Sequence, residues 1–128
     1  MLAYSPLANG LLTGKIGLER QFPPDDLRYN NPRFSVESRR EVQAFLDQIR
    51  PIATDYQVTL AQIVIAWTLA QPGVTHALVG ARDGEQALEN ARVGRITLLV
   101  QDLNKIEKAW RETFQAGNDV REEAAVRL

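Results

Sequence analysis

Two glycine-containing turns, at residues 5–15 and 80–90, carry residue types that could bind an anion. Each follows a short apolar segment typical of a strand, and α/β proteins bind ligands at the carboxyl ends of their strands. Glycine lets the backbone approach a ligand closely, while Lys15 and Arg82 could contact a phosphate. A helix that begins after Gly80 would add free N–H groups and the positive end of its dipole. Together these features indicate a possible phosphate site.

An ordinary structural interpretation competes with this one. Loop glycines such as Gly10 and Gly14 usually only form turns, and the Gly-x-Arg step at residues 80–82 is usually a plain connection between a strand and a helix. The local pattern alone favours turns that bind nothing.

Other side chains with catalytic potential are isolated in the sequence. The chain has no cysteine and a single histidine, His76, which lies in an apolar segment and is expected to be structural. No metal site and no cysteine nucleophile are expected, because metal sites need several ligands. Trp67 and Trp110 follow helical spacing, which favours core packing, and Arg39 and Arg40 are expected to be solvated helix charges.

The first part of the chain predicts a strand, a long loop and a helix. Residues 2–4 predict the end of a buried strand, and the glycine- and proline-rich residues 8–33 predict a loop. Apolar residues recur at helical spacing from residue 42 to residue 56, which predicts a helix with Ser35 as its N-cap. Pro51 predicts a kink or a break in that helix.

The rest of the chain predicts three more helices and one more strand. A second helix should begin at Thr59, at capping-box spacing from Gln62, and end before residues 72–73. Residues 74–79 predict a buried parallel strand. A third helix is expected from Asp83, which has Gln86 at capping-box spacing, to near residue 94. A fourth helix is expected over residues 100–114. Residues 117–128 are expected to form a mobile tail.

This order of elements is an α/β alternation with only two strands. Two parallel strands with about four helices leave ladder edges with unpaired N–H and C=O groups, and crossovers of this kind normally belong to a larger sheet. We therefore expect the chain to be part of a larger domain.

Composition excludes several classes of function. Of 128 residues, 45% are hydrophobic, and 15 Lys and Arg stand against 16 Asp and Glu, so no basic excess favours nucleic-acid binding. The longest apolar stretch, near residues 63–70, is far shorter than the roughly 18–20 residues of a membrane span, and the N-terminus lacks a signal-peptide pattern. A cytoplasmic protein without membrane or nucleic-acid partners is expected.

Two longer motifs carry a resemblance to a known family. Residues 4–15, YSPLANGLLTGK, are similar to the seventh-strand motif of the aldo-keto reductases, and residues 79–90, VGARDGEQALEN, are similar to their eighth-strand cofactor motif. Between them, FPPDDLR at residues 22–28 and NPRF at residues 31–34 resemble the linker of the bacterial oxidoreductase branch. The resemblance continues to about Phe114.

The resemblance implies a fold and a cofactor. Aldo-keto reductases are (β/α)₈ TIM barrels that reduce aldehydes and ketones by hydride transfer from NADPH. Such a barrel needs about 250 residues, so residues 1–128 would be a partial domain, the final third to half of the barrel. Gly84 stands where many members have Pro or Ala, which should loosen the start of its helix.

The resemblance also implies which residues would bind NADP(H). Ser5, Pro6, Leu7 and Gly10 would line the pyrophosphate, Lys15 and Arg28 would reach phosphates, and Gly80, Arg82, Gln86, Glu89 and Asn90 would hold the adenosine end and its 2′-phosphate. The position of Arg28 is the least constrained, because its loop varies in length within the family.

No catalytic residue is assigned in this chain. The family's catalytic Asp, Tyr, Lys and His lie on earlier strands, which would be upstream of Met1. The tyrosines and lysines present match no motif for a proton donor or its partner: Tyr4, Tyr29, Tyr56, Lys15, Lys105 and Lys108. The isolated chain is therefore expected to lack reductase turnover, and whether it binds NADP(H) alone stays open, as does the substrate.

Three functional hypotheses follow. The first is a truncated C-terminal, NADP(H)-binding portion of an aldo-keto reductase. The second is a non-enzymatic nucleotide-binding or self-associating module, whose open strand edges would pair with another copy or with an N-terminal barrel half. The third is a helical scaffold unrelated to cofactors.

Overall fold

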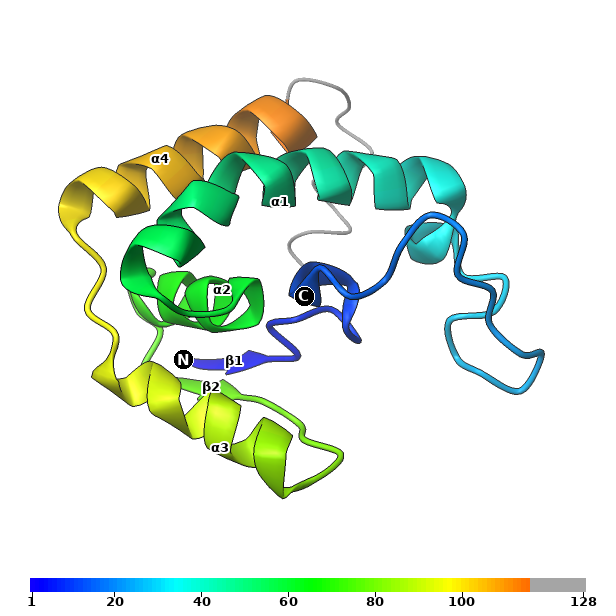
Figure 1. The fold of residues 1–128 in the computed structure, drawn as a ribbon, viewed down its shortest axis with the longest axis horizontal. Coiled ribbons are helices and arrows are strands. Elements are labelled where there is room, and N and C mark those ends of the chain that lie inside the picture. The colour runs from blue at the N-terminus through cyan, green and yellow to red at the C-terminus, as the bar shows by residue number, and fades with distance from the viewer. Residues whose placement is uncertain (116–128) are drawn as a thin grey trace.

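The computed structural model of the chain describes residues 1–115, so the tail predicted at residues 117–128 lies outside the described residues. Two strands and four α-helices are present in the described part (Figure 1). Their order is β1 (Leu2–Tyr4), α1 (Val36–Tyr56), α2 (Leu60–Leu69), β2 (His76–Leu78), α3 (Gly84–Arg92) and α4 (Val100–Trp110). Shorter 3-10 turns lie at Leu11–Thr13, Pro32–Phe34 and Val93–Arg95, and a π-helical turn lies at Arg111–Gln115. The predicted α/β order is confirmed.

The two strands pair in parallel, as predicted, but they are less buried than expected. Leu2 lies opposite His76, and Tyr4 lies opposite Leu78. Side chains alternate between the faces of a strand, so Ala77 and the following Val79 pack towards the helices while Leu78 faces away. Leu78 is 51% exposed and Tyr4 is 73% exposed, because the described residues place no helix over that face of the sheet.

Helix α1 begins as predicted and continues without a break. The side-chain oxygen of Ser35 accepts the N–H of Ser38 at 3.2 Å, which caps the helix. The sequence predicted a kink or a break at Pro51, and the break is wrong because α1 is continuous from Val36 to Tyr56. Pro51 lies on the exposed side of α1, where water can satisfy the carbonyl of Asp47 that loses its helical partner.

The main core lies between α1, α2 and α4. Phe45, Ile63 and Ile106, one from each helix, are fully buried. The rings of Phe45 and Trp110 meet edge to face with centroids 5.5 Å apart, and Trp67 packs at 5.5 Å from Trp110. The prediction of core positions for both tryptophans is confirmed. The capping box at the start of α2 is complete: Thr59 and Gln62 each accept the other's backbone N–H through a side-chain oxygen.

Helix α3 lies beside β2 and carries no fully buried residue (Figure 1). Its N-cap Asp83 accepts the N–H of Gln86 at 2.8 Å, as the capping spacing predicted. The box is only half formed, because the Gln86 side chain accepts the N–H of Arg82 instead of the N–H of Asp83. The start of α3 and the turn before it are thereby held together.

Candidate functional site

Parallel pairing of β1 and β2 brings the two predicted turns to the same edge of the sheet. Because Tyr4 is the partner of Leu78, Ser5 and Val79 leave the sheet side by side. The chain after β1 and the chain after β2 therefore start from neighbouring positions (Figure 1). This arrangement satisfies the first geometric condition for one ligand to contact both turns.

The turn after β1 is tightly folded. Ser5, Ala8 and Asn9 have left-handed backbone conformations with φ of 49°, 49° and 56°, which is uncommon for residues other than glycine. The N–H of Ala8 donates to the carbonyl of Ser5 at 3.0 Å, and the N–H of Gly10 donates to the carbonyl of Leu7 at 3.1 Å. Such a concentration of strained residues is typical of sites held in shape for a ligand.

The two glycines of this turn also have structural roles. Gly10 and Gly14 both have positive φ, of 91° and 77°. A Cβ at Gly14 would lie 2.9 Å from Cδ1 of Leu60 at the start of α2. Gly14 therefore serves the packing of the turn against α2, as the structural interpretation predicted.

Lys15 and Arg28, the two cations expected to reach phosphates, differ in whether they already have a partner. Lys15 is exposed, and its ammonium group has no partner in the described residues. Arg28 is bound to Asp26 by two side-chain hydrogen bonds, Nε to Oδ1 at 2.9 Å and Nη2 to Oδ2 at 2.7 Å. Its guanidinium also lies 4.4 Å from the centre of the Phe22 ring. Lys15 is free to meet an anion, whereas Arg28 already holds one.

The Asp26–Arg28 pair shifts the pKa of both groups. The side-chain hydrogen bond from Arg28, followed by the hydrogen bond from its backbone N–H, lowers the pKa of Asp26 to about 2. The same side-chain bond raises the pKa of Arg28. A phosphate could reach Arg28 only by sharing it with Asp26 or by displacing that carboxylate.

Arg39, in α1, holds the loop before that helix, a role that sequence reasoning missed. It was expected to be a solvated charge but is only 7% exposed. Its guanidinium donates to the carbonyls of Phe34 at 2.8 Å, Gly17 at 2.9 Å and Arg20 at 2.8 Å, which fastens both ends of the loop to α1. Its spacing of three from the buried Val42 was the signal that could have revealed it. The neighbouring Arg40 is exposed, as expected.

The turn after β2 leaves one cation and two N–H groups available. A Cβ placed at Gly80 would meet nothing within 4 Å, so this corner is open. The Arg82 side chain is exposed and has no partner in the described residues. The N–H groups of Gly84 and Glu85 lie in the first turn of α3, where a helix provides no acceptor. These groups could contact a phosphate together.

The three remaining residues expected at the adenosine end are already hydrogen bonded. Asn90 donates from Nδ2 to the carbonyl of Gly80 at 3.3 Å, and Gln86 accepts the N–H of Arg82 at 2.9 Å. Glu89 accepts the hydroxyl of Thr59 through Oε1 at 2.7 Å. Each keeps one free polar atom: Oδ1 of Asn90, Nε2 of Gln86 and Oε2 of Glu89. They therefore position α3 and could still contact a ligand.

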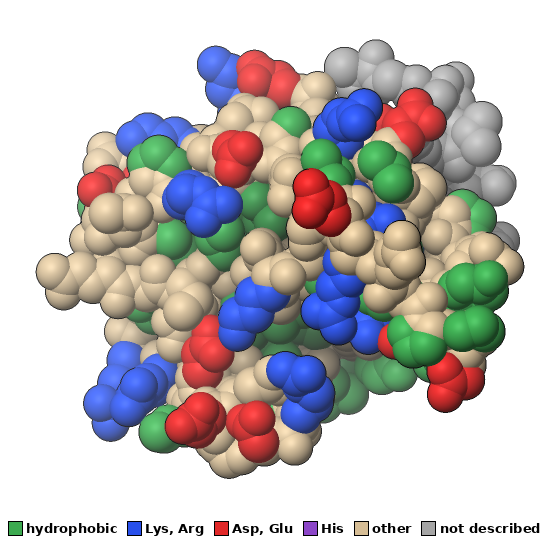
Figure 2. All heavy atoms as spheres, turned by 45° about the vertical axis from the view of Figure 1, so that its right-hand side comes forward, with side chains coloured by type: hydrophobic (Ala, Val, Ile, Leu, Met, Phe, Trp, Pro, Cys, Tyr) green, Lys and Arg blue, Asp and Glu red, His purple; other side chains and the backbone are tan. Residues whose placement is uncertain are grey.

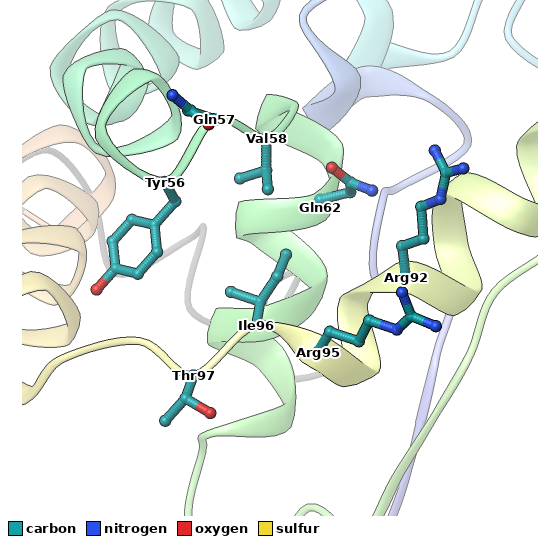
Figure 3. A pocket seen from close by; sticks show the side chains of 8 residues that line it. All are labelled: Tyr56, Gln57, Val58, Gln62, Arg92, Arg95, Ile96 and Thr97. Atoms are coloured by element: carbon teal, nitrogen blue, oxygen red, sulfur yellow. The ribbon is translucent and has the colours of Figure 1, made fainter.

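Two cavities in the described residues lie away from the two turns. One, of about 460 Å³, lies in the loop near Arg20, Phe22, Arg28 and Arg39. Another, of about 550 Å³, lies between the end of α1, the start of α2 and residues 92–97 (Figure 3). Of the residues expected to bind NADP(H), only Arg28 lines either cavity.

Charge over the molecule is mixed. Figure 2 shows Lys and Arg side chains near the middle of one face, with Asp and Glu among and around them.

His76 is exposed at the first position of β2, with Nδ1 3.1 Å from the Thr75 hydroxyl, and is not packed in an apolar strand as expected. Within residues 1–115 no group of three or more potential ligands could hold a metal ion, and no helix has the length and apolar character needed to cross a membrane.

Comparison with known proteins identifies one family. The model of the "Aldo/keto reductase family" matches residues 1–111. An uncharacterized oxidoreductase of Mycobacterium tuberculosis is 40% identical over 111 residues, which are 87% of this chain and 33% of that protein. An NADH-specific methylglyoxal reductase of Escherichia coli is 38% identical over 95 residues, which are 74% of this chain and 28% of that protein.

A solved structure supports the same relationship. The glycerol dehydrogenase of Gluconobacter oxydans superimposes with a TM-score of 0.78 at 30% sequence identity, covering 88% of this chain and 34% of that one. The chain thus spans about a third of the length of the relatives that it matches. Its two strands and four helices correspond to a part of a TIM barrel.

Proposed function

The chain belongs to the aldo/keto reductase family, and from this premise we propose that it is the C-terminal, NADP(H)-binding portion of a carbonyl reductase. In this proposal the two turns bind the phosphates and the adenosine of one dinucleotide. The observation that carries it is the parallel pairing of β1 with β2, which starts both turns from neighbouring positions. The cytoplasmic location expected from composition is part of the same proposal.

The side chains and N–H groups of the site that have no hydrogen-bond partner are of the types that bind phosphates. Arg82 has an unpaired guanidinium that can bind a phosphate through two parallel hydrogen bonds, and it lies beside the free N–H groups at the start of α3. We assign it to the 2′-phosphate of NADP(H). The strained turn at Ser5, Pro6, Leu7 and Gly10 would face the pyrophosphate, with Lys15 as its free cation. Gly80 leaves the backbone open to close approach.

The adenosine end uses side chains that the fold has already oriented. Gln86, Glu89 and Asn90 are held by hydrogen bonds to Arg82, Thr59 and Gly80, so little rotamer freedom is left to lose on binding. Arg28 would contribute only after its guanidinium is shared with Asp26. A bound nicotinamide dinucleotide would supply the hydride for carbonyl reduction.

This chain's own part in the reaction is binding and orientation. None of its tyrosines or lysines matches a proton-donor motif, so the residues that protonate the carbonyl oxygen would belong to other strands of the barrel. We therefore expect the 128-residue chain to bind the dinucleotide without turning over an aldehyde.

Binding of NADPH and NADH to Arg82→Gln tests the proposal. Loss of one charge-assisted contact is worth about 1.5–3 kcal/mol, so the Kd for NADPH should rise roughly tenfold or more while that for NADH changes little. Arg40→Gln, which removes an exposed charge from α1, is the matched control. Equal NADPH affinity in the Arg82→Gln variant and the unmodified chain would contradict the assignment.

A second candidate function, self-association, rests on the uncovered face of the sheet. Leu2, Tyr4 and Leu78 expose apolar surface there, and the outer edges of both strands have no partner strand in the described residues. Open edges and apolar faces favour pairing with another copy or with the remaining part of a barrel. Sedimentation of the chain at high micromolar concentration tests it, because a monomer under those conditions would exclude self-pairing.

A further inference from the structure

The cavity at the junction of α1 and α2 lies apart from both turns. It opens where the end of α1 meets the start of α2 and the segment after α3, and its volume is about 550 Å³ (Figure 3). Volumes of roughly 300–1,000 Å³ are usual for sites of small molecules. Eight residues line it: Tyr56, Gln57, Val58, Gln62, Arg92, Arg95, Ile96 and Thr97. None of them is among the residues assigned above to NADP(H).

Two of the polar lining groups already form hydrogen bonds within the fold. The Tyr56 hydroxyl donates to Oδ2 of Asp102 at 2.7 Å and accepts the N–H of Leu99 at 2.9 Å. The Gln62 amide accepts the N–H of Thr59 at 3.1 Å and donates to the carbonyl of Glu89 at 2.8 Å. These two side chains shape the cavity but offer little to a ligand.

Two guanidinium groups remain without partners. Neither Arg92 nor Arg95 has an ion pair or a side-chain hydrogen bond in the described residues, and no carboxylate lines the cavity. Figure 3 shows both side chains along one side of it, with Val58 and Ile96 between them and the Tyr56 ring. A ligand here would meet positively charged hydrogen-bond donors on one side and partly buried apolar side chains on the other.

Helix electrostatics favour a cation at both positions. Arg92 lies in the last turn of α3, and Arg95 ends the 3-10 turn Val93–Arg95 that continues this helix, so both lie near its negative end. Neither position gives the guanidinium an anionic side chain as a partner. Because both arginines line the same cavity, an anion bound there would meet two positive charges.

We propose that this cavity binds a small organic anion, whose phosphate or carboxylate group contacts Arg92 and Arg95 and whose apolar part lies against Val58 and Ile96. The site is independent of the proposed dinucleotide site, so each can fail without the other. Both arginines are solvent-exposed, and water screening should keep the binding weak, in the range of roughly 0.1–1 mM.

Titration of the full chain with phenyl phosphate and with benzoate, followed by amide NMR at constant ionic strength, tests the site. Saturable shifts are expected at Gln57, Val58, Ile96 and Thr97, and the tighter of the two probes identifies the acid group that is preferred. The double variant Arg92→Gln, Arg95→Gln should weaken binding at least tenfold. Because both side chains are exposed, this variant should keep the fold, which thermal unfolding checks.

The matched controls separate a specific site from general charge attraction. The double variant Arg40→Gln, Arg50→Gln removes the same charge from exposed positions of α1 and should bind both probes as the unmodified chain does. Benzyl alcohol, which is neutral, should bind at least tenfold more weakly. Shifts that do not saturate, equal binding of benzyl alcohol, or equal loss in both double variants would each overturn the proposal.

Discussion

The hydroxyl of Tyr56, at the end of α1, donates a hydrogen bond of 2.7 Å to Oδ2 of Asp102 in the first turn of α4. The same oxygen accepts the N–H of Leu99 at 2.9 Å, so one phenol joins two helices and the segment between α3 and α4. The N–H of Leu99 lowers the pKa of Tyr56, but burial, the hydrogen bond to Asp102 and nearby negative charge together raise it above its ordinary value. The phenol therefore stays protonated and donating through the physiological pH range.

Tyr56→Phe removes both hydrogen bonds and leaves the ring in place. Asp102 is only 8% exposed, so its carboxylate would lose a donor where water replaces it poorly. We expect the free energy of unfolding to fall by about 1–3 kcal/mol, measured by urea denaturation. Tyr4→Phe, at a position that is 73% exposed and has no hydrogen bond through its hydroxyl, is the control and should change little. Equal effects of the two substitutions would show that the Tyr56 hydroxyl contributes nothing specific.

Arg39→Met tests whether a buried guanidinium holds the loop before α1. The substitution keeps an unbranched apolar side chain but leaves the carbonyls of Gly17, Arg20 and Phe34 without their donor. The expected loss is about 2–4 kcal/mol, together with faster proteolysis within residues 17–34. Arg40→Met, at the exposed neighbouring position, should leave both measurements within error. An unchanged cleavage rate in Arg39→Met would mean that other contacts hold the loop.

The carboxyl of Asp26 provides a prediction about pH. Its pKa is lowered to about 2 in the folded chain, against an ordinary value of 3.8, chiefly by the side-chain hydrogen bond from Arg28. A lowered folded pKa stabilises the fold above the ordinary value, and the contribution is lost as pH falls from about 4 through about 2. The pair is only partly buried, so screening by solvent keeps this contribution small.

Carboxyl NMR of the full chain measures the titration midpoint of Asp26 directly. The midpoint should lie near 2 in the unmodified chain and return towards 3.8 in Arg28→Gln. Arg33→Gln, in the same loop, should leave it unchanged. An Asp26 midpoint near 3.8 in the unmodified chain would show that the pair does not persist in solution.

Local sequence signals predicted the helices and strands well, but they predicted poorly which residues surround or contact a given side chain. Capping residues such as Ser35, Thr59 and Asp83 fix helix starts through contacts with residues three positions away, so their effect is visible in the sequence. Of the kink or break predicted at Pro51, the break does not form, because solvent access on one side of α1, a tertiary property, helps the helix to tolerate proline. The burial of β1 and β2 was overestimated because it depends on neighbours that the described residues do not supply.

For the candidate site, the sequence indicated which turns carry cations and could not indicate which cations are free. Arg28 and Arg82 are equivalent as residue types, yet only Arg28 has a carboxylate two positions before it that folds back to bind it. Arg39 shows the opposite error, because its partners are backbone carbonyls 5, 19 and 22 residues away, which leave no pattern of residue types. The structure therefore added most where a side chain binds a partner in or across a loop, because the sequence does not show such a partner.

Two glycines of the candidate site should respond in opposite ways to alanine. Gly14 has φ of 77°, and an added Cβ would lie 2.9 Å from Cδ1 of the buried Leu60, so Gly14→Ala should destabilise the chain by about 1–2 kcal/mol. Gly84 begins α3 with nothing within 4 Å of an added Cβ, so Gly84→Ala should stabilise it by about 0.4–1 kcal/mol.

The same glycine pair separates stability from ligand binding. Gly84→Ala keeps the backbone N–H that we assign to the phosphate site, so the Kd for NADPH should stay within about twofold while the melting temperature rises. Gly14→Ala shifts the contact between the first turn and α2, so it should weaken both stability and NADPH binding. A Gly84→Ala variant that is more stable but binds NADPH tenfold more weakly would mean that a ligand needs the open space at this corner, because its N–H groups are unchanged.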